Sequence, residues 1–198
     1  DLHAFGRLQI HRDGPLVAVH AVVVGGLGLA DAHAPVAGVV APAGVLHLDD
    51  IGTKVGQHRF NAACTVREEQ TPERTYTPQY GYFEVRARGP RDPRCLFALW
   101  MIGFEDAPER SGEIAIMEIK GSNMTPSTAR NGHGIHPWAD PQLRDDFAET
   151  ELPIDATQFH IYAAEWKPDR VDFYVDNWLV RTVQQSPRYP MQFMLDIY

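Results

Sequence analysis

The feature that most constrains the fold is a two-residue alternation of apolar and polar side chains, which recurs from Phe60 onward. In the segment 77–88, Phe83 and Val85 occupy one parity, and polar or aromatic residues occupy the other. Successive side chains of a strand point to opposite faces, so this pattern predicts a half-buried strand. Helical periodicity is weak throughout, and 141–151 predicts at most a short turn of helix.

Short strands are expected along the whole chain, separated by turns. Two tight turns are predicted at 167–170 and at Asp176–Asn177, whose residues tolerate the left-handed region. So many strands in 198 residues predict one β-sandwich domain. The predicted strands cover 16–24, 36–48, 77–88, 96–102, 113–119, 129–138, 159–166, 171–175, 178–183 and 191–198.

Charge and residue usage exclude several classes of function. The chain has 26 acidic and 18 basic residues, and its net charge of −8 argues against binding to nucleic acid or to an anionic membrane surface. The most apolar run, 16–30, is too short and too often broken to span a bilayer. Cys64 and Cys95 either pair or are both buried thiols, and we favour buried thiols.

The histidines of the first 50 residues do not predict a metal site. Their spacing matches no metal-ligand pattern, so no metal is expected there. The chain begins without methionine, which is compatible with a removed signal peptide. These histidines are His3, His11, His20, His33 and His47.

The sharpest motif is the segment 111–119, where Glu113 and Glu118 lie in an otherwise apolar strand. An ionised carboxylate in such a strand costs several kcal/mol unless it is partnered or faces water. We therefore expect the strand to line a cleft with one face and the core with the other. In a regular strand the two glutamates would point to opposite faces, and a β-bulge near Met117 would return them to the same face.

Several further blocks accompany this motif. They are 80–88 (YGYFEVRAR), 98–103 (ALWMIG), 159–162 (FHIY), 165–166 (EW) and 173–176 (FYVD). With the two glutamates, these blocks resemble glycoside hydrolase family 16, the group of laminarinases, lichenases and agarases. The resemblance covers 77–198 and implies an all-β, concanavalin A-like jelly roll of two curved antiparallel sheets. It implies one domain over 1–198 that is one terminal strand shorter than usual.

The family resemblance also implies a reaction. Glu113 would be the nucleophile and Glu118 the general acid/base of a retaining endo-β-glycosidase. A β-1,3- or β-1,3/1,4-glucan is the favoured substrate, and a galactan is the other polysaccharide considered. No catalytic cofactor is expected, although a structural calcium ion is compatible with the family. A secreted monomer that acts on a polysaccharide or oligosaccharide is the expected form.

Two departures from the family pattern keep other functions open. Ala115 stands where the family has an aspartate that hydrogen-bonds the nucleophile, and Leu96-Phe97 replaces a usual Trp-Pro. A weakly active or non-catalytic polysaccharide-binding module on the same fold is therefore the alternative. A β-sandwich interaction domain without a sugar site is the third hypothesis.

Four residues are further candidates for substrate binding, each with a structural alternative. Trp100 resembles a sugar-stacking tryptophan but could be a core residue. His136 lies where laminarinase-like relatives have a histidine facing the catalytic acid, and the alternative is a surface histidine. Trp138 is a candidate second platform, and Arg86 either binds sugar hydroxyls or pairs with a neighbouring acid. We expect Glu165 to be structural and Trp166 and Tyr174 to be core residues.

Overall fold

The computed structural model describes residues 17–22, 39–41, 45–47, 52, 54–57, 63–72, 74 and 77–197. The first three of these segments are described by their backbone alone, so the predictions about the histidines of the first 50 residues lie outside the described side chains. Among the described residues, no helix has the length and apolar character needed to cross a membrane.

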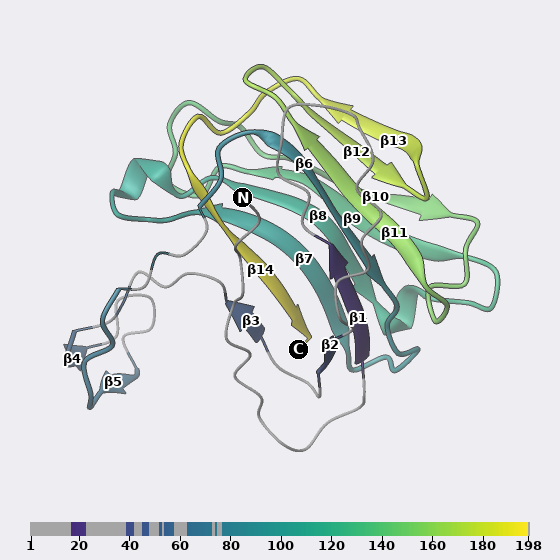
Figure 1. Ribbon diagram of the computed structural model, residues 1–198, viewed down its shortest axis with the longest axis horizontal. Helices are drawn as coiled ribbons and strands as arrows, with labels where there is room; N and C mark the ends of the chain where they lie inside the picture. The colour runs from purple at the N-terminus through teal and green to yellow at the C-terminus, as the bar shows by residue number, and fades with distance from the viewer. Residues whose placement is uncertain are drawn as a thin grey trace.

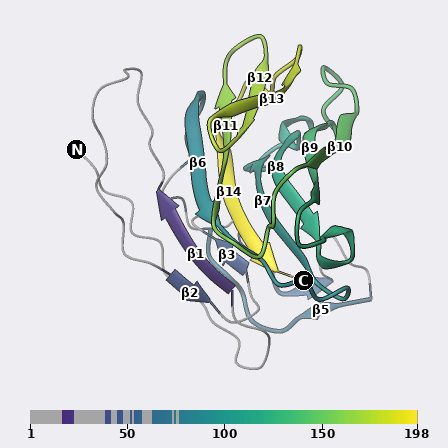
Figure 2. The same ribbon diagram turned by 90° about the vertical axis from the view of Figure 1, so that its right-hand side faces the viewer.

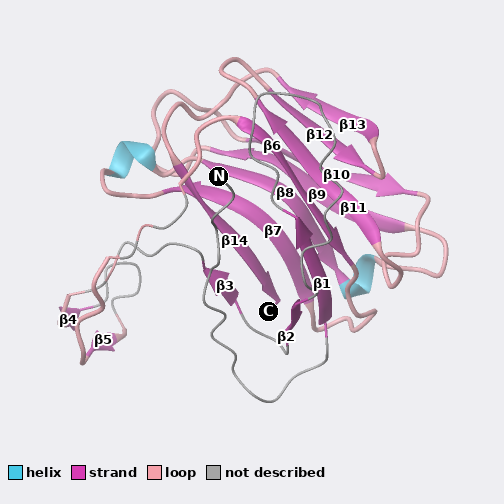
Figure 3. Cartoon of the chain, viewed as in Figure 1, coloured by secondary structure: helices cyan, strands magenta, loops and turns pink. Residues whose placement is uncertain are grey.

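Two six-stranded antiparallel sheets pack face to face, and Figure 2 shows them edge-on. Figure 1 follows the chain through both layers, and Figure 3 shows that helix is confined to short 3-10 turns, Pro108–Arg110 and Gly121–Asn123 among the described residues. The first sheet has the order β13 (Trp178–Val183), β12 (Val171–Val175), β11 (His160–Trp166), β6 (Gly81–Ala87), β1 (Val17–Val22) and β2 (Val39–Ala41).

The second sheet carries the residues of interest. It has the order β10 (Asp146–Leu152), β9 (Ala129–His136), β8 (Glu113–Lys120), β7 (Leu96–Gly103), β14 (Met191–Ile197) and β3 (Val45–His47). A separate two-stranded ribbon joins β4 (Gly56–Gln57) and β5 (Thr65–Val66). The predicted jelly-roll sandwich of antiparallel sheets is confirmed.

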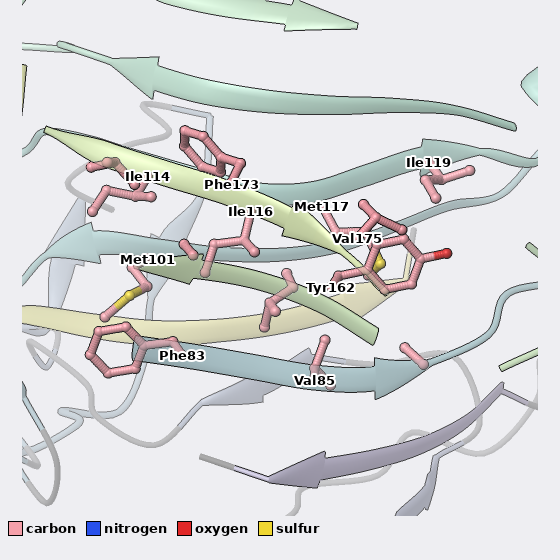
Figure 4. Packing of buried hydrophobic residues seen from close by; sticks show 14 of the residues in the cluster. Phe83, Val85, Met101, Ile114, Ile116, Met117, Ile119, Tyr162, Phe173 and Val175 are labelled. Carbon is pink, nitrogen blue, oxygen red and sulfur yellow. The ribbon is translucent and has the colours of Figure 1, made fainter. Parts of the chain in front are cut away.

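The core lies between the two sheets and is built from the apolar parity of strands β6 to β14 (Figure 4). On β6, Phe83 and Val85 are buried as the alternation predicts. Ile114 on β8 comes from the opposite sheet and is fully buried. Trp166 is also in the core, where its indole N–H donates to Ser186 Oγ at 2.7 Å. This packing fixes which face of β8 is left for other uses.

Two sequence predictions were wrong, and one edge strand was not predicted. The segment 141–151 contains most of an edge strand, β10, and no helix; β10 pairs only with β9 and is mostly polar, so it lacks an apolar signal. Cys64 is an exposed free thiol and Cys95 a partly buried one. Tyr174 is half-buried on the outer face of β12, where it lies beside Tyr82, because its parity is opposite to that of Phe173.

Candidate active site

A β-bulge in β8 sets the geometry of the site. Trp100 on β7 pairs with Ala115, and Leu99 pairs with Met117, so Ile116 is an extra residue on β8. Beyond the bulge, Ala98 pairs with Glu118. The inserted residue restores the parity of Glu118, as the sequence predicted.

Glu113, Ala115 and Glu118 therefore share the face of β8 that is turned away from the core. The bulge also shortens the separation of the two glutamates along the ladder. They oppose Ile102 and Ala98, so their Cα atoms are spaced as four ladder steps, about 13 Å along a flat strand. Sheet curvature and the length of the side chains therefore have a shorter distance to bridge between the two carboxyl groups than in a regular strand.

A buried polar chain holds the bulge from the core side. The backbone N–H of Glu118 donates to Asn131 Oδ1 at 3.1 Å. The Asn131 amide lies 3.2 Å from His133 Nδ1, and His133 Nε2 lies 3.2 Å from the Thr150 hydroxyl. Asn131 and His133 are buried. The ladder hydrogen bond that the bulge disrupts is thus replaced by a side chain of β9.

Glu113 is buried and has one strong polar contact. Glu113 is only 6% exposed, and Trp138 Nε1 donates a hydrogen bond to its Oε2 atom at 2.7 Å. Burial raises the pKa of Glu113 to about 7, and the negative charge of Glu118 adds to the rise. The Trp138 hydrogen bond and the charge of His136 act in the opposite direction. Glu113 therefore titrates near neutral pH.

Glu118 is half-buried on the same face. Burial raises its pKa above the ordinary value, the Asp196 carboxylate raises it further, and His136 opposes the rise. A raised pKa is what a general acid needs, because the group must hold its proton at the working pH. Both carboxyl groups are thus tuned by the same neighbours.

His136 lies directly beside the nucleophile candidate, because it is the strand partner of Glu113. Its Nδ1 is 2.6 Å from Asp145 Oδ1, and its ring stacks on Phe147 with centroids 4.7 Å apart. The carboxylate and the ring fix the orientation of the imidazole. The imidazole of His136 therefore has a fixed orientation at the site, unlike that of a freely rotating surface histidine.

Trp100 also lies on the glutamate face, next to Ala115. Its indole N–H donates to Asp196 Oδ2 at 2.9 Å, so its edge is fixed by β14. It is partly exposed and thus not a core residue.

Arg86, in contrast, lies on β6 in the other sheet, stacked over the Phe159 ring at 4.2 Å. The structure does not bring Arg86 to the glutamates, and its guanidinium group lies over this ring.

Four other residues of the site were not predicted from the sequence. Asp196 is a buried acid in an apolar strand, the same signal that singled out Glu113. Asn131 and His133 fall on the core parity of β9, where polar residues signal a buried network. Phe147 was missed because β10 was missed.

Two carboxyl groups on one face of a jelly-roll sheet, beside a fixed histidine and tryptophans, define a site of the glycoside hydrolase class. A family model agrees with this class: residues 61–198 match the model for glycosyl hydrolases family 16. The chain belongs to this family.

Individual relatives carry several activities. A β-glucanase of Rhodothermus marinus is 36% identical over 111 residues, which cover 50% of this chain and 36% of that protein. A β-1,3-glucan-binding protein of Penaeus monodon is 32% identical over 125 residues, which cover 56% of this chain and 33% of that protein. This chain thus spans about a third of the length of these relatives.

A solved structure is similar over a larger part of the chain. The GlcNAcα1-4Gal-releasing endo-β-galactosidase of Clostridium perfringens superposes with a TM-score of 0.61 at 30% identity. The match covers 78% of this chain and 40% of that chain.

Proposed function

We propose that the protein is a retaining endo-β-glycosidase that hydrolyses a β-1,3- or β-1,3/1,4-glucan. The observation that carries the proposal is the bulge at Ile116, which puts Glu113 and Glu118 on one face of β8. The name of the R. marinus relative supports a β-glucan as substrate. The C. perfringens structure keeps a galactan as the second substrate to test.

The two glutamates divide the chemistry between them. Ionised Glu113 attacks the anomeric carbon, while protonated Glu118 gives its proton to the leaving glycosidic oxygen. This step forms a glycosyl ester on Glu113 and leaves Glu118 ionised. Glu118 then removes a proton from water, which attacks the anomeric carbon and frees Glu113. Configuration is retained because two displacements occur at the anomeric carbon and each of them inverts it.

A non-catalytic glucan-binding module is the second candidate. Ala115 supports it, since a methyl group at that position cannot assist either carboxyl group. The name of the P. monodon relative supports it as well. Binding would then depend on the aromatic rings of the site, which pack on the apolar faces of sugars.

An assay for new reducing ends separates these candidates. Laminarin, lichenan, agarose, carrageenan and xyloglucan are incubated with the wild type, Glu113→Gln and Glu118→Gln. We expect the wild type to release reducing ends from laminarin or lichenan, and each variant to lose about a thousandfold or more in kcat. Glu68→Gln, a change in an exposed loop residue, is the matched control and should keep full activity.

The contrary result is equally clear. A wild type that binds laminarin in a pull-down assay and releases no reducing ends from any polysaccharide would replace the hydrolase by the binding module. Retention is checked by the anomer first formed, followed by proton NMR.

We also infer that the protein works outside the cell as a monomer and without a catalytic cofactor. The family resemblance supports these three points, and the proposed mechanism uses only carboxyl groups. Activity should be unchanged after dialysis against EDTA. A loss that added calcium restores would reveal a structural ion.

A further inference from the structure

The nucleophile candidate has a hydrogen-bond partner that comes from outside its strand. Trp138 lies in the turn after β9, and its indole nitrogen is 2.7 Å from Glu113 Oε2. An indole N–H can donate and cannot accept. Its hydrogen bond to a carboxyl oxygen is stronger when that group is ionised, so it favours the charged form of Glu113 over the neutral form.

The turn that carries Trp138 is built for this contact. Trp138 has a φ of 45°, in the left-handed region that non-glycine residues rarely adopt. Such a conformation persists only where the surroundings hold it. Here the N–H of the next residue, Ala139, donates to Ser111 Oγ at 2.9 Å, and Ser111 Oγ donates to the carbonyl of Pro108 at 2.8 Å. Ser111 is buried and lies two residues before Glu113.

A second link joins the same turn to the start of β8. Tyr189 donates its hydroxyl hydrogen to Asp140 Oδ2 at 2.8 Å, and its oxygen accepts the N–H of Gly112 at 2.7 Å. Asp140 closes the turn through its own N–H, which donates to the carbonyl of Pro137. The turn and the residues directly before Glu113 are therefore held by one hydrogen-bond network, which positions the indole relative to the carboxylate.

Position 115 offers no such partner. Ala115 lies between Glu113 and Glu118 on the same face, is fully buried and ends in a methyl group. A donor aimed at Glu113 has to come from elsewhere, and the Trp138 turn supplies it.

We propose that Trp138 is a positioning residue: held by its hydrogen-bonded turn, it orients Glu113 and stabilises the ionised form of its carboxyl group, a task that the methyl side chain of Ala115 cannot perform. This inference rests on the proposed function, because it assigns a role toward the same nucleophile. In this role, the N–H group of the Trp138 indole contacts Glu113. The residue is 63% exposed, so much of its surface stays open to a sugar.

Trp138→Phe tests the proposal, because phenylalanine keeps a ring and removes the donor. We expect kcat on the best β-glucan to fall about tenfold to a hundredfold, with a smaller change in KM. The acid limb of the kcat/KM profile should move to higher pH, because Glu113 loses a partner of its charged form. Trp178→Phe, on an exposed tryptophan of β13, is the matched control and should change neither quantity.

A double variant tests whether the two positions share one task. In Trp138→Phe, the added change Ala115→Asp should recover several-fold of the lost kcat, while Ala115→Asp alone should raise the wild type by less. Ser111→Ala, which frees the turn, should reproduce part of the Trp138→Phe effect. Equal effects of Ala115→Asp in both backgrounds, or a rise in kcat for Trp138→Phe, would overturn the proposal.

A measurement that needs no turnover separates this inference from the proposed function. Titration of the ¹³C-labelled Glu113 carboxyl group by NMR, in the Glu118→Gln background, reports its pKa directly. We expect Trp138→Phe to raise that pKa further. If the wild type releases no reducing ends and the pKa still rises, the hydrolase fails and the positioning role holds. If the wild type is active and neither the pKa nor kcat changes in Trp138→Phe, the positioning role is wrong and the hydrolase stands.

Discussion

The indole N–H of Trp100 donates to the carboxylate of Asp196 at 2.9 Å, which joins β7 to β14 on the face that carries the glutamates. Asp196 is buried, and its strand partner Ala98 is also the partner of Glu118. A third negative charge thus lies two strands away from Glu118. Burial is the main cause that raises the pKa of both glutamates, and Asp196 adds to the rise in each case.

Asp196→Asn should move the whole pH profile of kcat/KM to lower pH. The asparagine oxygen can still accept the Trp100 hydrogen bond, but the charge is gone. Both Glu113 and Glu118 then ionise more easily, so the acid limb and the alkaline limb both shift downward. The measurement is the rate on laminarin or lichenan between pH 4 and pH 9.

Asp169→Asn removes an exposed charge in the turn before β12 and is the matched control, with an unchanged profile. A profile of Asp196→Asn that stays in place, or that moves upward, would show that this carboxylate has no electrostatic influence on the pair.

Asn131→Ala should loosen the bulge. The variant leaves the N–H of Glu118 without its acceptor and His133 without its neighbour, and an unsatisfied buried donor costs about 1–3 kcal/mol. We expect the free energy of unfolding in urea to fall by about that amount and kcat to fall as well. Gln158→Ala, an exposed change outside this network, is the control. Full stability with full activity in Asn131→Ala would mean that packing alone maintains the bulge.

Glu113 and His133 should give stability opposite dependences on pH. Burial raises the pKa of Glu113 from its ordinary 4.5 to about 7, so its contribution is lost as the pH rises through that window. Burial lowers the pKa of His133 from 6.5 to about 4, with the Arg181 charge adding to the effect, so its contribution is lost as the pH falls through that window. Each contribution is of the order of 3 kcal/mol.

Two variants separate the contributions. Relative to the wild type, Glu113→Gln should gain stability as the pH rises from 5 to 7, and His133→Gln should gain stability as the pH falls from 6.5 to 4. Urea unfolding at a series of pH values measures both. Parallel curves for the wild type and a variant would show that the group in question titrates normally in the folded protein.

The sequence was sufficient for the strands that have one apolar face. The alternation around Phe83 and Val85 predicted β6, and two left-handed residues at Asp176 and Asn177 confirm the predicted turn. Glu113 and Glu118 were found because charge in an apolar strand requires an explanation, and the bulge followed from their parity. The same reasoning would have found Asp196.

Other features depend on contacts that no local pattern contains. The hydrogen bond of Trp138 joins residues 25 positions apart and needs a left-handed turn that tryptophan does not favour. Strand β9 contains glycines, which strands ordinarily disfavour. The structure shows that Gly134 has a φ of 147° and that a Cβ there would lie 2.2 Å from the carbonyl oxygen of Asp146. Gly134 is therefore required by the close approach of the β10 backbone.

The bulge at Ile116 limits which sequence changes the segment between the two glutamates can tolerate. The position of Glu118 depends on how many residues separate it from Glu113, and much less on which apolar residues they are. Loss of a single codon between them would leave both glutamates in the chain and turn Glu118 toward the core, where its charge could not be accommodated. In this segment, natural variation should therefore exchange one apolar side chain for another of similar size, while insertions and deletions are eliminated.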